Sequence, residues 1–216
     1  MIIGERKIGF GAPCLIVAEL GSAHLGDLER AYQLIDSAAD AGADCVKFQL
    51  IIADEIVHPR TGVIDLPGGK IPVYQRFKKL ERGVEFYAEI KEYAEKRGAI
   101  FLCSAFGIES ARLLRSLNIQ AIKIASPELN HYPLLEEVAG YNVPLILSTG
   151  VSTLGDIEKA LAVTCSTSGK TILLHCVTSY PAPEDDYNLK LIPNLSALFG
   201  TTVGVSDHSK DPLLIP

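Results

Sequence analysis

Seven short apolar segments alternate along the chain with segments that have the apolar periodicity of helices. The apolar segments lie at 14–20, 43–49, 99–106, 121–126, 144–150, 170–177 and 202–208. Each is nearly continuously apolar, which is typical of a parallel strand that helices cover on its faces. This alternation predicts an α/β fold built from repeated strand–helix units.

Local signals support the helices between these segments. We predict helices over 26–43, 84–97, 109–117, 133–140, 156–163 and 193–200. In the first helix, Asp27 is the expected N-cap, Gly42 the expected stop, and Leu28, Ala31, Tyr32, Ile35 and Ala39 the expected apolar face. Thr153 and Asp156 have the spacing of a capping box. By contrast, 51–82 predicts a long irregular stretch of the kind that often covers a site.

Polar residues follow the apolar segments at their C-terminal ends, where TIM-barrel enzymes place their active sites. We therefore favour a TIM (β/α)8 barrel over a doubly wound sheet. Only seven strands are predicted, and a seven-stranded barrel would leave two unpaired edges. The expectation is a single barrel domain over 1–216, truncated after the seventh strand.

Charge and composition exclude several classes of protein. The formal net charge of −6 argues against nucleic acid as a partner, and an anionic ligand would need cations placed locally. No apolar segment has the length of a membrane span, and the N-terminus has no signal-peptide core, so we expect a cytoplasmic protein without a membrane partner. The five cysteines are scattered and suggest neither a disulfide framework nor a zinc site.

Two lysines lie in otherwise apolar predicted strands. Lys47 is in DCVKFQ and Lys123 is in AIKIAS. Burying an ammonium without a partner is costly. A small, multiply charged anion would satisfy both lysines if a barrel placed them in one cavity, with strand-end hydroxyls completing its shell. Structural ion pairing, for example of Glu19 with one of the lysines, is the alternative.

Other strand-end residues also allow two interpretations. Ser104 and Ser148 are candidates for the anion shell, but strand-end serines commonly cap the next helix. His175 lies among apolar residues, which favours a hydrogen-bonded core histidine over a ligand. His208, in SDH, is the best single metal candidate, although no HxH or HExxH pattern accompanies it.

Together, these motifs resemble those of the sialic acid synthase family (N-acetylneuraminate synthase, NeuB-like). The motifs that carry the resemblance are, in order, GSAHLGD, GADCVKFQ, FLCSAF, KIASPELN, PLILSTG, LLHCVTSYPAP and VGVSDH. The resemblance extends from about residue 14 to residue 209. It implies a TIM barrel that condenses phosphoenolpyruvate with N-acetylmannosamine or a related N-acyl amino-sugar aldehyde. The products would be phosphate and a nine-carbon 2-keto acid.

The resemblance also implies roles for individual residues. Glu19 and Glu128 match catalytic carboxylates, and Glu128 is our candidate general base. The residues that match phosphoenolpyruvate-binding positions are Lys47, Ser104, Lys123, Ser126, Ser148 and Ser206. Gln49 and Tyr180 match positions near the sugar. His208 matches one ligand of a divalent metal, Mn²⁺ or Mg²⁺, and family members form homodimers.

The sequence departs from the family pattern at several positions. Residues that are usual in the family are replaced at four positions, by Ala23, Ala105, Pro127 and Thr178. The replacement at Thr178 puts a direct role for that residue in doubt. The resemblance places a second metal histidine in an eighth strand and an arginine in a C-terminal antifreeze-like domain. Neither segment is found in the 216 residues, so we expect this chain alone to be nearly inactive.

Two other functions remain open at this stage. A Schiff-base aldolase of a 2-keto acid would also place a lysine on a barrel strand. A non-catalytic sugar- or anion-binding remnant of a synthase would explain the incomplete metal site. The sequence leaves the sugar aldehyde open among N-acetylmannosamine, its 6-phosphate and the precursors of legionaminic and pseudaminic acids.

Overall fold

The computed structural model describes residues 1–66, 69–165 and 170–214, which divide into two compact units. The first unit comprises Cys14–Gln120. The second unit comprises Met1–Pro13 and Ala121–Pro216.

The first unit contains three parallel strands in the order β7-β4-β3. They are β3 (Val17–Gly21), β4 (Cys45–Gln49) and β7 (Ile100–Ala105), and the helices that follow them include α1 (Leu28–Asp40), α4 (Val84–Lys96) and α5 (Ile108–Ser116). Strand β4 lies between the other two, and most of its side chains are buried. Its continuous apolar character in the sequence follows from this central position.

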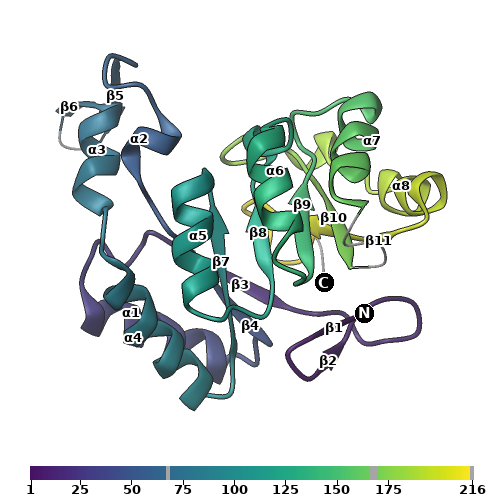
Figure 1. The fold of residues 1–216 in the computed structure, drawn as a ribbon, viewed down its shortest axis with the longest axis horizontal. Coiled ribbons are helices and arrows are strands. Elements are labelled where there is room, and N and C mark those ends of the chain that lie inside the picture. The colour runs from purple at the N-terminus through teal and green to yellow at the C-terminus, as the bar shows by residue number, and fades with distance from the viewer. Residues whose placement is uncertain (67–68, 166–169, 215–216) are drawn as a thin grey trace. The chain divides into compact units, whose positions relative to one another are not determined.

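Helices α1 and α4 lie side by side in the first unit (Figure 1). The rings of Tyr32 and Tyr93 stack with their centroids 4.1 Å apart, and Arg97 pairs with Asp36. The predicted N-cap is confirmed, because the Asp27 side chain accepts a hydrogen bond from the Arg30 N–H.

The buried face of α1 differs slightly from the expected one. Its buried residues are Ala31, Ile35 and Ala38, whereas Ala39 is only half-buried. Gly42 follows the helix with φ of 86°, as expected of a residue that stops a helix in the left-handed region.

The prediction of an irregular stretch over 51–82 is wrong. This segment contains α2 (Ala53–Ile56), an antiparallel hairpin of β5 (Val63–Leu66) and β6 (Gly69–Pro72), and α3 (Val73–Leu80). Residues 67 and 68 lie outside the described residues. These elements are too short to show a clear period in the sequence. An isolated two-stranded hairpin is also only marginally stable, so its formation depends on the rest of the fold and not on its own sequence alone.

The second unit contains four parallel strands in the order β11-β10-β9-β8. They are β8 (Ile122–Ile124), β9 (Leu145–Ser148), β10 (Thr171–Cys176) and β11 (Thr202–Ser206). Helices α6 (Tyr132–Ala139), α7 (Leu154–Val163) and α8 (Leu191–Phe199) follow β8, β9 and β10 in turn (Figure 1). The predicted capping box of Thr153 and Asp156 begins α7.

A small antiparallel hairpin of β1 (Ile2–Ile3) and β2 (Arg6–Lys7) also belongs to the second unit. This hairpin was not among the elements expected from the sequence. Ile3 is fully buried in the structure, which anchors a hairpin that would be unstable in isolation.

The predicted fold class is confirmed. In the described residues, each of the seven predicted segments contains a strand of a parallel α/β arrangement, and both units have the strand–helix repeat of a TIM barrel. The predicted and observed ends differ by at most three residues; the first strand, for example, begins at Val17 rather than at residue 14. None of the helices described is long and apolar enough to cross a membrane.

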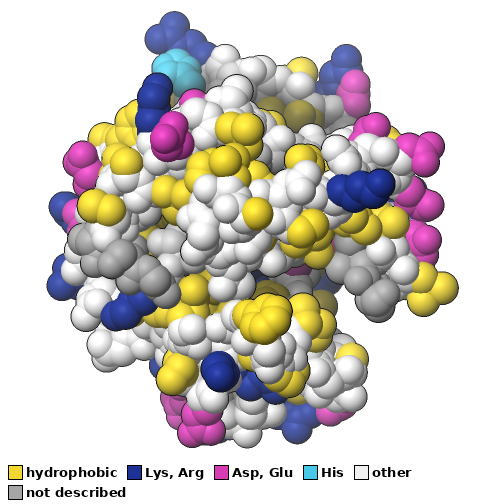
Figure 2. Space-filling model, turned by 90° about the vertical axis from the view of Figure 1, so that its right-hand side faces the viewer, with side chains coloured by type: hydrophobic (Ala, Val, Ile, Leu, Met, Phe, Trp, Pro, Cys, Tyr) yellow, Lys and Arg dark blue, Asp and Glu magenta, His cyan; other side chains and the backbone are white. Residues whose placement is uncertain are grey.

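Figure 2 shows hydrophobic side chains near the middle of the face that lies at the right of Figure 1, with charged side chains mainly at its margin. Val151, Leu154 and Leu198 are among the exposed hydrophobic residues of the second unit. Exposed apolar side chains of this kind are common on protein surfaces, and they do not by themselves identify a binding site.

Candidate functional site

The first unit brings three predicted site residues together at the ends of its strands. Glu19 and Lys47 are register partners on β3 and β4, and their side chains form an ion pair. The Lys47 ammonium also lies 3.4 Å from Ser104 Oγ on β7. The Lys47 side chain is 14% exposed and that of Glu19 is 48% exposed, so the pair opens to solvent on the carboxylate side. The structural pairing of Glu19 is thus observed.

Gln49 is two residues beyond Lys47 on the same face of β4. Its amide lies beside Gly21, where an added Cβ would come within 3.7 Å of Gln49 Nε2. The backbone carbonyl of Gln49 accepts a hydrogen bond from the buried Tyr87 hydroxyl at 2.9 Å. Tyr87 therefore fixes the backbone at the C-terminal end of β4, from which Lys47 and Gln49 project.

Lys123 is the most deeply buried cation of the second unit's predicted site, with 5% exposure. Its Nζ donates to Ser148 Oγ at 2.6 Å and to the Ile124 carbonyl at 2.8 Å. Each contact supplies an oxygen acceptor for the N–H groups of the lysine. Ser148 therefore supports the lysine, and its role as a helix cap is not observed.

Glu128 follows β8 in the short helix η1 (Ser126–Glu128). Burial raises the pKa of its carboxyl group to about 7, although the nearby Lys123 charge acts in the opposite direction. Its Oε2 atom is buried and contacts no hydrogen-bond partner among the described residues. A carboxyl group with this pKa can accept a proton near neutral pH.

Ser126 has a defined set of partners within the second unit. Its hydroxyl oxygen accepts a hydrogen bond from the Gly150 N–H at 3.0 Å, and it lies 3.0 Å from Cys176 Sγ. Ser126 and Cys176 are both buried. A Cβ atom on Gly150 would overlap the side chains of Cys176 and Thr178, so this close approach requires glycine.

His208 lies just beyond β11, next to two other predicted site residues. Its Nδ1 lies 2.8 Å from the Val177 carbonyl, which can only accept, so Nδ1 carries the proton. Its Nε2 then has an acceptor lone pair, which faces the Tyr180 hydroxyl at 3.1 Å and the Ser206 hydroxyl at 3.4 Å. The Tyr180 and His208 rings stack with their centroids 4.2 Å apart.

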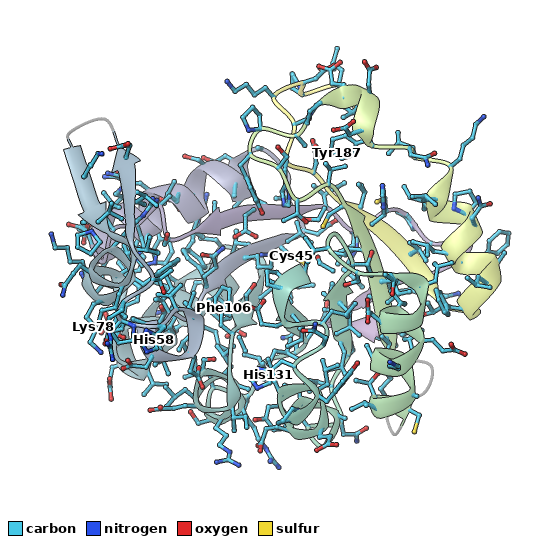
Figure 3. All side chains as sticks on the ribbon, turned by 90° about the horizontal axis from the view of Figure 1, so that it is seen from above. Cys45, His58, Lys78, Phe106, His131 and Tyr187 are labelled. Atoms are coloured by element: carbon cyan, nitrogen blue, oxygen red, sulfur yellow. The ribbon has the colours of Figure 1, made fainter. Side chains whose placement is uncertain are left out.

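Tyr187, which no sequence signal indicated, anchors this histidine. It lies in the loop before α8 and is labelled in Figure 3. Its hydroxyl donates to Asp207 Oδ1 at 2.5 Å and accepts from the His208 backbone N–H at 2.6 Å. The Tyr187 carbonyl is 2.5 Å from His175 Nε2, which confirms His175 as a hydrogen-bonded core residue. Nothing in the sequence EDDYN signals this role.

The geometry of His208 fits one position of a metal site. A metal-ligating histidine commonly donates its second ring N–H to a carbonyl, which leaves the other nitrogen for the metal. This is the arrangement of Val177, Nδ1 and Nε2 at His208. In the part of the chain that the structure describes, no cluster of three or more His, Cys, Asp or Glu side chains is arranged to hold a metal. His208 is therefore a single candidate ligand.

His24 lies in the loop between β3 and α1 and is almost completely buried. Its ring packs against Phe86 and Phe48, with centroid distances of 4.9 and 5.8 Å, and its Nδ1 accepts from the Gly26 N–H at 2.9 Å. Burial, reinforced by the Arg82 charge, lowers the pKa of His24 to about 4. His24 is thus a neutral structural residue of this loop at physiological pH.

The predicted residues therefore form separate groups in the two units. Glu19, Lys47 and Ser104 are in contact within the first unit. In the second unit, Lys123 contacts Ser148, and Ser206 and Tyr180 both contact His208. The prediction that Lys47 and Lys123 share a cavity stays a prediction, because the two lysines belong to different units.

Comparisons with known proteins agree on the family. The NeuB family model matches residues 34–215. Spore coat polysaccharide biosynthesis protein SpsE of Bacillus subtilis is 38% identical, with 99% of this chain and 58% of SpsE aligned. N,N'-diacetyllegionaminic acid synthase of Campylobacter jejuni is 39% identical, with 91% of this chain and 61% of that protein aligned. The chain thus spans about three fifths of the length of these curated relatives.

A solved structure agrees with the sequence comparisons. N-acetylneuraminic acid synthetase from Leptospira borgpetersenii is 33% identical and superimposes with a TM-score of 0.88. The match covers 100% of this chain and 72% of that one. A family model that covers most of the chain, together with relatives of this similarity, shows that the chain belongs to the NeuB family.

Proposed function

We propose that the protein is a sugar-acid synthase that joins phosphoenolpyruvate to an N-acyl amino-sugar aldehyde. The products are a nine-carbon 2-keto acid and phosphate. Membership of the NeuB family and the names of the relatives support this class of enzyme. The observation that carries the proposal is that the buried Lys123–Ser148 contact occurs in the same unit as Glu128, and that the carboxyl group of Glu128 has a pKa of about 7.

The anion is bound by cations and hydroxyl groups at the strand ends. Lys123 and Lys47 neutralise the carboxylate and phosphate of phosphoenolpyruvate. The serines that complete the shell are Ser104, Ser126, Ser148 and Ser206. Two of these hydroxyls already contact a lysine, which supports their placement beside the anion. Charge-assisted hydrogen bonds of this type are short and strong, and they fix the orientation of the reacting carbon.

Glu128 is the general base. Carbon C3 of phosphoenolpyruvate attacks the aldehyde carbon, water adds at C2, and the resulting tetrahedral centre expels phosphate. The added water must lose a proton, and the unpaired Oε2 of Glu128 accepts it. Glu19 is the second carboxylate, and its ion pair with Lys47 keeps that ammonium in place until the anion binds.

The remaining residues hold the metal and the sugar. His208 would hold Mn²⁺ or Mg²⁺ through Nε2, and the bound metal would polarise the aldehyde as a Lewis acid. Tyr180 is 75% exposed and stacks on His208, which suits a residue that contacts a sugar beside the metal. Gln49, on the same strand as Lys47, provides an amide for the sugar hydroxyls.

The Schiff-base alternative has less support. A Schiff-base lysine attacks a carbonyl carbon with its nitrogen, whereas Lys123 Nζ already donates to Ser148 Oγ and to the Ile124 carbonyl. Borohydride treatment with pyruvate is therefore expected to leave Lys123 unmodified. A reduced pyruvate adduct on Lys123 or Lys47 would support the aldolase instead.

The direct test is phosphate release by the intact protein with phosphoenolpyruvate, Mn²⁺ and an aldehyde. The aldehydes to compare are N-acetylmannosamine, its 6-phosphate and the diacetylated precursors of legionaminic and pseudaminic acids. We expect turnover with one class of aldehyde and loss of turnover with EDTA. Binding of phosphoenolpyruvate without turnover on any of the aldehydes would support a non-catalytic binding protein and overturn the proposal.

A further inference from the structure

Cys176 contacts Ser126, a residue of the candidate anion site, and the proposed function gives Cys176 no role. The residue is the last of β10, is 4% exposed, and places Sγ 3.0 Å from Ser126 Oγ. The same Ser126 oxygen accepts the Gly150 N–H at 3.0 Å. These two contacts surround a hydroxyl that we have assigned to phosphoenolpyruvate binding.

The number of lone pairs on the Ser126 hydroxyl oxygen limits the hydrogen bonds that it can accept. Ser126 has one O–H donor and two acceptor lone pairs, and Gly150 occupies one lone pair. Either the Cys176 thiol donates to the second lone pair, or the Ser126 hydroxyl donates to sulfur. Sulfur is a weak acceptor and the thiol is likewise a weak donor, so the contact distance is compatible with both directions. The first arrangement leaves the Ser126 proton available for an anion, whereas the second directs it away.

Thr178 supplies a further contact to the sulfur. Its hydroxyl lies 3.9 Å from Cys176 Sγ, and either group can be the donor in this contact. Gly150 allows the segment after β9 to approach the segment at the end of β10, because any side chain at Gly150 would overlap Cys176 and Thr178. The Gly150 N–H and the Cys176 thiol therefore both lie against the Ser126 hydroxyl oxygen.

The geometry points to Cys176 as a positioning residue that orients Ser126. The Cys176 thiol and the Gly150 N–H both donate to Ser126 Oγ, and together they direct the Ser126 hydroxyl proton to the bound anion. This inference rests on the proposed function for the identity of that anion, phosphoenolpyruvate. The hydrogen-bond direction itself does not depend on it.

Vibrational spectroscopy of the ligand-free intact protein tests the direction of the hydrogen bond. The S–H stretching band of Cys176 is identified by its loss in Cys176→Ala. In Ser126→Ala, we expect this band to shift to higher frequency, because the thiol loses its acceptor oxygen. An unchanged band would overturn the inference, whether or not the protein is a synthase.

Steady-state kinetics test the consequence for the anion. Cys176→Ala is expected to raise KM for phosphoenolpyruvate about five- to tenfold, the effect of one lost hydrogen bond, with little change in kcat. Cys176→Ser keeps a donor and should return KM to within about twofold of the original value. KM for the aldehyde should not change, since we assign Ser126 to the anion and not to the aldehyde.

Cys45→Ala is the matched control, because Cys45 is a buried cysteine at the start of β4 (Figure 3). It should leave KM for phosphoenolpyruvate unchanged. Equal KM values for wild type and Cys176→Ala, or no recovery in Cys176→Ser, would overturn the positioning role. If the wild-type protein does not bind phosphoenolpyruvate, the proposed function fails and the anion-directing role fails with it, while the thiol band still decides the bond direction.

Discussion

Lys123 illustrates how a charged residue is accommodated in an apolar strand. The ammonium donates to two oxygen acceptors, Ser148 Oγ and the Ile124 carbonyl, and these bonds offset part of the cost of its burial. Two neutral acceptors stabilise the ammonium without cancelling its charge. The residue therefore retains an attraction for an anion, which is the property that the proposed function uses.

Replacing Lys123 by Met should abolish phosphoenolpyruvate binding. Stability should change by less than about 1.5 kcal/mol, because removing a buried charge offsets the loss of two hydrogen bonds. Calorimetric titration with phosphoenolpyruvate and urea unfolding measure the two effects. Lys96→Met, at an exposed residue of α4, is the control for a lost positive charge. Complete unfolding of Lys123→Met would mean that the lysine is structural.

Glu128→Gln should lower turnover strongly and change how stability depends on pH. The folded-state pKa of about 7 lies above the usual value of 4.5, so wild-type stability falls as pH rises from about 4.5 to 7. The variant lacks this loss and should be more stable than wild type by on the order of 2 kcal/mol at pH 8, but not at pH 4.

Urea unfolding at several pH values measures this difference. The kcat of wild type should rise with pH through about 7, since the base acts in its ionised form. Glu136→Gln, at an exposed carboxylate of α6, is the control and should show neither effect. A wild-type profile that is flat between pH 6 and 8 would argue against Glu128 as the base.

Tyr187→Phe should weaken binding of Mn²⁺ by about tenfold, the usual effect of removing a group that orients a ligand. The variant loses the hydroxyl that joins Asp207 to the His208 backbone. Metal titration of the intact protein measures the affinity. Tyr93→Phe, which removes a Tyr–Asp hydrogen bond in the first unit, should not alter it. Equal effects of the two substitutions would make Tyr187 a general structural residue.

The loop between β3 and α1 shows how one element is held by another. Arg82, which follows α3, donates from Nε to the Gly26 carbonyl at 3.1 Å and from Nη2 to the Leu25 carbonyl at 3.4 Å. His24 holds the same loop from within, through the Gly26 N–H. Because Nδ1 must be unprotonated to accept this bond, protonation of the ring would release it.

His24→Asn should make the protein less sensitive to acid. The folded-state pKa of about 4 lies below the usual 6.5, so the unfolded chain binds a proton that the folded chain does not. The stability due to His24 is present above pH 6.5 and is lost as pH falls towards 4. An asparagine keeps an acceptor near Nδ1 and removes the titration, which should reduce the loss by on the order of 1–2 kcal/mol.

Thermal unfolding between pH 7 and 4 gives the measurement. His58→Asn is a closely matched control, because exposed His58 also accepts from the backbone N–H two residues later, that of Arg60. It should follow the wild-type curve. If the two variants have the same pH dependence, burial of His24 has no part in the acid sensitivity.

The whole molecule belongs to a family whose relatives are longer than this chain. The aligned fractions of SpsE and of the Campylobacter synthase are 58% and 61%. The resemblance places a second metal histidine and an arginine in segments beyond those matched here. The cytoplasmic location, the homodimer and the single-domain organisation stay predictions.

The sequence alone determined the strand–helix order and the residue types at the strand ends. Near-continuous apolar segments such as 99–106 are a local signal, since a covered strand needs apolar residues on both faces. The N-cap at Asp27 and the capping box of Thr153 are local for the same reason: their partners lie three residues away. Such features depend on near neighbours in the chain, so they can be predicted without the fold.

Only the tertiary structure decided which side chains are in contact. The pairing of Glu19 with Lys47, the contact of Ser126 with Cys176 and the anchoring of His208 by Tyr187 join residues between 21 and 50 positions apart. The pKa of Glu128 likewise depends on burial by the surrounding chain. These properties arise from long-range packing, and no periodicity in the sequence encodes which distant neighbour a side chain meets.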